Sequence, residues 1–140
     1  MSAIVALLAD DDINGHRERA GEPLVEGYVR AFEQIDADPN NILIVGERDG
    51  AIVATAQLTF IPTMTQQGAT RAIIESVRVS SRVRSQGVGE QLIAHLEQLA
   101  REKHCPAVQL TTSKPRTGAQ RFYARIGFAQ SHFGYKRELQ

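Results

Sequence analysis

Residues 73–89 read Ile-Ile-Glu-Ser-Val-Arg-Val-Ser-Ser-Arg-Val-Arg-Ser-Gln-Gly-Val-Gly, and this stretch carries the strongest indication of the fold. A run rich in β-branched residues passes into a polar loop, and two glycines then open an amphipathic helix. The first N–H groups of a helix have no partner within it and carry the positive end of its dipole. Because glycine also lets a ligand approach the backbone closely, the stretch predicts an anion-binding turn.

Other nucleotide-binding loops fit this stretch less well. The P-loop needs a lysine after its last glycine, and none follows Gly89. The dinucleotide fingerprint needs a third glycine where this chain has Leu92.

Arg84, with Arg82 nearby, can add bidentate contacts to phosphate oxygens. For the stretch alone, the alternative is a tight strand-to-helix turn with solvated arginines.

Outward from this turn, the pattern predicts alternating helices and strands. Helices are expected over 2–9, 23–35, 87–103 and 116–126, and strands over 42–47, 51–61, 70–79 and 107–112, with two short strands within 128–139. Asp49-Gly50 is a hairpin signal between the first two strands, and Gly127 is placed to end the last helix. This order predicts an α/β fold of the mixed α+β kind, in which helices flank one mixed sheet. We expect residues 1–140 to form a single domain.

Composition narrows the function classes. Sixteen Lys and Arg balance sixteen Asp and Glu, and aromatic residues make up 6% of the chain. A neutral chain has no global field for nucleic acid or an anionic membrane, so neither is expected as a partner. The apolar start, residues 1–8, has no basic region before it and meets three aspartates at once, so we expect a cytoplasmic protein. The four histidines show no metal-ligand spacing, and no metal is expected.

Two motifs resemble those of one large enzyme family. Arg84-x-x-Gly87-x-Gly89 resembles the Arg/Gln-x-x-Gly-x-Gly/Ala motif of the GCN5-related N-acetyltransferase (GNAT) superfamily. Residues 119–128, Ala-Gln-Arg-Phe-Tyr-Ala-Arg-Ile-Gly-Phe, resemble its second signature, Ala-x-x-Phe-Tyr-x-x-x-Gly-Phe. The resemblance covers residues 40–138 well and the N-terminal third loosely. It implies a GNAT-like central mixed sheet flanked by helices. Because this chain opens with an expected helix over residues 2–9, the family's N-terminal edge strand is expected to be absent.

The resemblance also implies acetyl-CoA as a co-substrate. Its pyrophosphate would lie on the loop and helix start, and its pantetheine arm along the strand before them. The cofactor-binding residues implied are Val77, Arg78, Val79, Arg84, Ser85, Gln86, Gly87, Val88, Gly89 and Glu90. By the same analogy, a backbone N–H near residues 77–79 would hold the oxyanion. Many relatives dimerise, so the resemblance implies a homodimer.

Two residues are candidates for proton transfer to and from the reacting groups. Tyr123 is the candidate general acid, because a phenol with a pKa near 10 can donate to a thiolate whose conjugate acid lies nearer 8.5. Glu75 is the candidate base, acting through water. Strand alternation places it on one face with Ile73, Val77 and Val79, and burial there would raise its pKa. The alternatives are a packed aromatic for Tyr123 and a salt bridge or an outward position for Glu75.

The predicted reaction is transfer of an acetyl group to a primary amine by direct attack in a ternary complex. The single cysteine, Cys105, is expected to be structural, which leaves no thiol for a covalent intermediate. The neutral charge balance favours a small-molecule amine as acceptor over a histone-like tail. The alternatives are a non-catalytic acyl-CoA-binding regulatory module and an acyltransferase that uses a longer acyl chain.

Overall fold

Four strands in the order β1-β2-β3-β4 form one sheet in the computed structural model, which describes residues 1–140. The chain divides into two units, Met1–Leu110 and Thr111–Gln140, and each is described by itself. The first unit contains α1 (Ser2–Ala9), η1 (Gly15–Arg17), α2 (Glu26–Ala37), β1 (Asn41–Arg48), β2 (Ala51–Pro62), α3 (Thr65–Gly68), β3 (Thr70–Val79), α4 (Val88–Glu102) and β4 (Val108–Gln109). The second contains α5 (Thr117–Arg125).

The sheet is mixed, as the sequence predicts. Strands β1, β2 and β3 are antiparallel neighbours, and α4 connects β3 to the parallel strand β4. Asp49 and Gly50 have φ values of 52° and 79°, which is the left-handed pair that a two-residue hairpin turn requires. No strand precedes α1 within residues 1–140, so β1 lies at the edge of the sheet.

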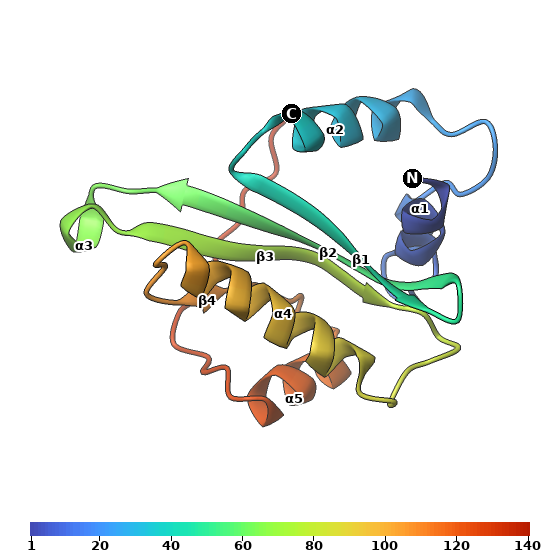
Figure 1. The fold of residues 1–140 in the computed structure, drawn as a ribbon. Helices are drawn as coiled ribbons and strands as arrows, with labels where there is room; N and C mark the ends of the chain where they lie inside the picture. The colour runs from blue at the N-terminus through green and yellow to red at the C-terminus, as the bar shows by residue number, and fades with distance from the viewer. The chain divides into compact units, whose positions relative to one another are not determined.

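Helices cover both faces of the sheet in the first unit. Helices α1 and α2 lie on one face and α4 on the other (Figure 1). Most of the hydrophobic core lies between α4 and the sheet. Side chains alternate along a strand and recur every three to four residues along a helix, so one face of β2 and β3 packs on the apolar stripe of α4. The buried residues of this part of the core are Ala54, Ala56, Leu58, Phe60, Ala72, Ile74, Val88, Leu92, Ile93, Leu96 and Ala100.

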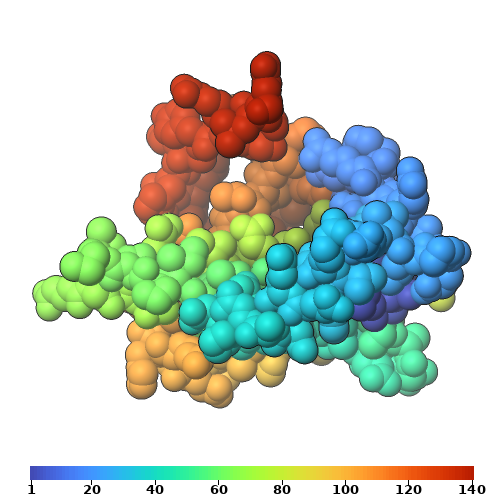
Figure 2. All heavy atoms as spheres, turned by 90° about the horizontal axis from the view of Figure 1, so that it is seen from above, coloured from blue at the N-terminus to red at the C-terminus, as the bar shows by residue number.

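The β2–β3 hairpin extends past the rest of the first unit and carries α3 at its tip (Figure 2). Met64 at this tip is almost fully exposed. Gln66 and Gln67 have φ values of 52° and 61°, so the tip is a left-handed turn and not a regular helical segment. None of the helices has both the length and the hydropathy that crossing a bilayer requires.

Three predictions of local structure are wrong. The second helix begins at Glu26 and not at Pro23, because Val25 is still extended and Glu26 brings a carboxylate to the first turn, where the helix dipole favours it. The fourth strand covers only Val108–Gln109 and not 107–112, because its ladder with β3 ends at the Ile73–Gln109 pair. Residues 128–139 form no strand, because their N–H and C=O groups make no ladder with another segment.

Candidate functional site

The glycine turn lies at the start of α4, as the sequence predicts. Gly87 is the N-cap, with φ 80° and ψ 4°, and no side chain caps the helix. Gln91 is the first residue of the helix whose N–H makes a helical hydrogen bond, to the Gly87 carbonyl oxygen at 3.1 Å. The N–H groups of Val88, Gly89 and Glu90 therefore have no partner within the helix, and they concentrate positive potential at this end.

Open space lies beside this helix start. A Cβ added at Gly87 would meet no atom within 4 Å, so the backbone there can be approached from outside. Ser85 also has a left-handed backbone, with φ 64°. Both residues are exposed. The turn thus fits a phosphate group: it presents the first N–H groups of a helix and the positive end of its dipole, and there is room for a ligand next to Gly87.

Arg84 contacts two backbone carbonyl groups near the glycine turn. Its Nε donates to the Val79 carbonyl oxygen at 3.3 Å, and its Nη2 donates to the Asp10 carbonyl oxygen at 2.9 Å. These two nitrogens form one side of the guanidinium group. This side holds the loop together, so it does not make a bidentate contact with a phosphate. Phosphate binding by Arg84 stays a prediction.

The sequence pattern missed Arg48 as a neighbour of the loop. Its Nη1 donates to Oε1 of Gln86 at 2.8 Å, across 38 residues of sequence. Arg48 also lines a cavity of about 450 Å³ between the β1–β2 hairpin and the residues of α4 that include Val88 and His95. No local signal marks Arg48, because only the antiparallel pairing of β1 and β2 brings the end of β1 to this loop.

A bulge in β3 changes the predicted position of Glu75. Glu75 pairs with Gln57 and Arg78 with Thr55, so β3 has one residue more than β2 between these pairs. Ser76 takes the left-handed conformation, with φ 55°, at the extra position. Because an inserted residue reverses the alternation, Glu75 shares its face with Arg78 and not with Val79. Glu75 does share its face with Ile73, as predicted, but not with Val79, and its side chain is exposed instead of buried.

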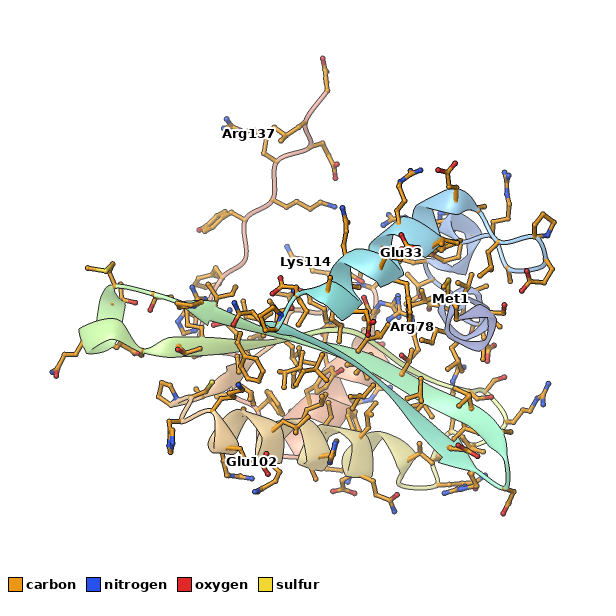
Figure 3. The ribbon with its side chains drawn as sticks, turned by 45° about the horizontal axis from the view of Figure 1, so that its top comes forward. Met1, Glu33, Arg78, Glu102, Lys114 and Arg137 are labelled. Atoms are coloured by element: carbon orange, nitrogen blue, oxygen red, sulfur yellow. The ribbon has the colours of Figure 1, made fainter.

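The face that carries Glu75 is the one covered by α1 and α2. Figure 3 shows Arg78 on that side of the sheet, with Glu102 of α4 on the opposite side. Arg78 donates to the Val77 carbonyl oxygen at 2.8 Å and forms an ion pair with Asp11 at 3.4 Å. The Asp11 side chain is only 7% exposed, so this pair ties the segment after α1 to β3.

Strand β3 has a free edge beyond Ile73. Its parallel ladder with β4 contains only the pairs Ala72–Val108 and Ile73–Gln109. Val77, Arg78 and Val79 are half-buried and follow the bulge on this edge. Backbone groups of residues 75–79 therefore have no strand beside them on the side away from β2. Strands β3 and β4 therefore separate after the Ile73–Gln109 pair.

In the second unit, Gly127 ends α5 as predicted. With φ 104° at Gly127, the Phe128 N–H donates to the Tyr123 carbonyl oxygen at 2.9 Å and the Gly127 N–H to that of Ala124 at 3.2 Å. This is the Schellman arrangement, in which the residue after the glycine packs back on the helix. Tyr123 is half-buried between the rings of Phe122 and Phe128, whose centroids lie 5.1 and 5.6 Å from its own.

The proposed phosphate turn and Glu75 both belong to the first unit, and Tyr123 belongs to the second. No three or more His, Cys, Asp or Glu side chains are grouped so that they could hold a metal ion. Cys105 is half-buried, and burial raises the pKa of its thiol. A high thiol pKa lowers the fraction of reactive thiolate at neutral pH.

Comparison with known proteins covers most of the chain. Residues 7–128 match the model of the acetyltransferase (GNAT) family. A crystal structure from Bacillus halodurans C-125, described as a transcriptional regulator, is 46% identical and superposes with a TM-score of 0.94 over 99% of this chain and 92% of that chain.

Two characterised relatives act on amines. Aminoalkylphosphonate N-acetyltransferase of Salmonella typhimurium is 38% identical over 66 residues, which are 47% of this chain and 43% of that enzyme. This match therefore spans less than half of the Salmonella enzyme. Aminoglycoside N(6′)-acetyltransferase type 1 of Serratia marcescens is 26% identical over 115 residues, which are 80% of this chain and 77% of that enzyme.

Proposed function

The chain belongs to the acetyltransferase (GNAT) family, and from this premise we propose that it transfers an acetyl group from acetyl-CoA to a small primary amine. We take residues 1–140 to act as one N-acetyltransferase domain. The acceptor class follows the two relatives, whose names specify aminoalkylphosphonates and aminoglycosides. A homodimer and a cytoplasmic location stay predictions.

The start of α4 is the observation that carries this proposal. Gly87 begins a helix whose N-terminus has no side-chain cap, and such a turn suits a phosphate group. The N–H groups of residues 88–90 would bind the pyrophosphate, with those of Ser85 and Gln86 beside them. Residues 77–79, at the edge of β3 that has no strand beside it, would receive the pantetheine arm through backbone groups.

Bound acetyl-CoA would supply the activated thioester, and side chains of the protein would accept and donate the protons. Glu75 is exposed on the face that carries α1 and α2, so it can take a proton from the acceptor amine through water. The Tyr123 hydroxyl would give a proton to the departing sulfur. Backbone N–H groups of residues 77–79 would hold the oxygen on which negative charge develops. Cys105 takes no part.

One observation favours a second candidate function, a non-catalytic acyl-CoA-binding regulatory module. The 46% identical protein of Bacillus halodurans is described as a transcriptional regulator. Such a module would use the turn at Gly87 and the edge of β3, but it would not need Glu75 or Tyr123. The two candidates therefore differ in turnover and not in CoA binding.

The deciding experiment measures CoA release from acetyl-CoA with a thiol reagent across a panel of amines. The panel holds aminoalkylphosphonates, aminoglycosides, amino sugars, polyamines, amino acids and a lysine peptide. We expect release that depends on one class of small amine. Tight CoA binding by calorimetry with no release across the panel would favour the regulatory module, and absence of CoA binding would contradict both candidates.

A further inference from the structure

Asp10, at the end of α1, touches the proposed phosphate loop at two points although it lies about 70 residues before it in the sequence. Its Oδ2 accepts a hydrogen bond from the Ser81 N–H at 2.9 Å. Its backbone carbonyl oxygen accepts one from Arg84 Nη2, also at 2.9 Å. One residue thus holds the beginning and the middle of the segment between β3 and α4.

The loop needs such outside support because its own backbone is strained. Ser85 has φ 64°, a left-handed conformation that is unfavourable for an L-residue with a side chain. Few contacts within the loop offset this cost, among them Arg82 N–H to Ser80 Oγ at 3.3 Å and Gln86 Nε2 to the Arg82 carbonyl oxygen at 3.5 Å. The shorter bonds come from outside: from Asp10, from Arg48 and from Val53, whose carbonyl oxygen accepts a hydrogen bond from the Ser80 N–H at 2.8 Å.

The charge of Asp10 is itself informative. A carboxylate close to a phosphate site repels the ligand, so direct binding of phosphate is not its role. The Ser81 N–H first, and then the nearby Arg84 and Arg82, hold the pKa of Asp10 below its usual range. Asp10 therefore stays ionised at neutral pH and keeps a charge-assisted hydrogen bond to the loop.

We propose that Asp10 is a positioning residue for acetyl-CoA, which fixes the loop of residues 80–87 in the conformation that presents the α4 N-terminus to the pyrophosphate. The inference rests on the proposed function. If the loop takes its binding conformation only part of the time, the apparent Kd for CoA equals the intrinsic Kd divided by the fraction of molecules in that conformation. Loss of the Asp10 carboxylate should therefore weaken CoA binding without any lost contact to CoA itself.

Calorimetry of CoA binding to the full chain tests this proposal. Asp10→Ala removes the acceptor for Ser81, and we expect its Kd for CoA to rise about tenfold, in line with the loss of one charge-assisted hydrogen bond. Asp10→Asn keeps an oxygen for the Ser81 N–H and should stay within about threefold of the parent. Asp12→Ala is the matched control, because it removes the same charge two residues away at an exposed position.

Two further measurements separate loop positioning from general stability. Amide exchange over residues 80–87 should quicken in Asp10→Ala, while exchange in β2 stays unchanged. With S-acetylpantetheine, which lacks the pyrophosphate, kcat/KM should differ less than twofold between Asp10→Ala and the parent, whereas with acetyl-CoA it should fall about tenfold.

The outcomes distinguish this inference from the proposed function. If the parent protein does not bind CoA, the proposed function fails. If the parent binds CoA and Asp10→Ala binds it equally well, the positioning role of Asp10 fails while the proposed function stands. Equal losses with acetyl-CoA and S-acetylpantetheine, or an Asp10→Asn variant as weak as Asp10→Ala, would also overturn the positioning role.

Discussion

The ring of Phe128 lies edge-on to the ring of Tyr123, with centroids 5.6 Å apart and planes inclined at 66°. Gly127 makes this contact possible, because its φ of 104° turns the chain back on the helix it has just ended. Phe122 packs on the same tyrosine at 5.1 Å. A ring held by two neighbours loses rotamer freedom, so the direction of the Tyr123 hydroxyl is set by local packing.

Gly127→Ala should destabilise the protein by roughly 1–2 kcal/mol, because any Cβ is strained at this positive φ. Thermal unfolding measures the effect. Gly118→Ala is the matched control, since it replaces a glycine inside α5 with the best helix former and should stabilise by up to about 1 kcal/mol. Equal effects of both changes would contradict the role assigned to Gly127.

Tyr123→Phe should lower kcat by about 10²-fold, the scale of general-acid catalysis, with the KM for acetyl-CoA nearly unchanged. The substitution keeps the ring and therefore its packing against Phe122 and Phe128. Steady-state kinetics with the best amine of the panel measure this effect, and circular dichroism checks the fold. An unchanged rate would remove Tyr123 from the mechanism.

Gly87→Asp should abolish detectable CoA binding, because it places a carboxylate in the open space before the α4 N-terminus. Calorimetry with CoA is the measurement. Gly68→Asp is a close control: Gly68 has φ 82° against 80° at Gly87, and a Cβ there also meets nothing within 4 Å. The backbone strain is thus matched, and only Gly87→Asp should lose binding. Similar CoA affinity in both variants would place the phosphate site elsewhere.

Glu75→Gln should lower kcat by about 10²-fold at saturating acetyl-CoA, because an amide cannot accept the proton of the amine. CoA affinity should not change, since Glu75 lies before the bulge and outside the glycine turn. Glu102→Gln on α4, also exposed, is the control and should leave kcat unaltered. Loss of CoA affinity in Glu75→Gln, with kcat kept, would assign this residue to binding and not to catalysis.

Cys105 should react slowly with iodoacetamide at pH 7–8, because burial raises the pKa of its thiol and leaves little thiolate. The rate should rise steeply above pH 9 as the thiol ionises. The measurement compares alkylation rates with those of a short cysteine peptide.

Cys105→Ser should keep full activity and intersecting initial-rate patterns, as a ternary complex requires. Parallel patterns would argue for a covalent intermediate.

Local sequence was enough for the elements whose signals lie within a few residues. Asp49-Gly50 predicts its hairpin because a two-residue turn needs two positive φ values. Gly127 predicts the end of α5, and Gly87 the start of α4, since both positions need a conformation that side chains disfavour. The apolar stripe of α4 follows from its helical period: Leu92, Ile93, Leu96 and Ala100 are buried, and Leu99 is half-buried.

Other features depend on pairing between distant segments. The bulge at Ser76 appears only when β3 is set against β2, where one strand has an extra residue. No pattern in residues 73–79 reveals it, and it moves Glu75 to a face shared with Arg78. Tertiary contacts also decide what Arg84 binds, since the Asp10 carbonyl oxygen comes from the other end of the unit's sequence.

The sequence alone determined the order of helices and strands, the glycine turn and the family resemblance, because helical period, strand alternation and positive φ are local properties of the backbone. The tertiary structure decided which arginine holds the loop, which face Glu75 occupies and where β4 separates from β3. These depend on strand register and on hydrogen bonds across some 40 to 70 residues, such as Arg48 to Gln86 and Ser81 to Asp10. Such contacts form only when the chain packs, so no window of sequence contains them.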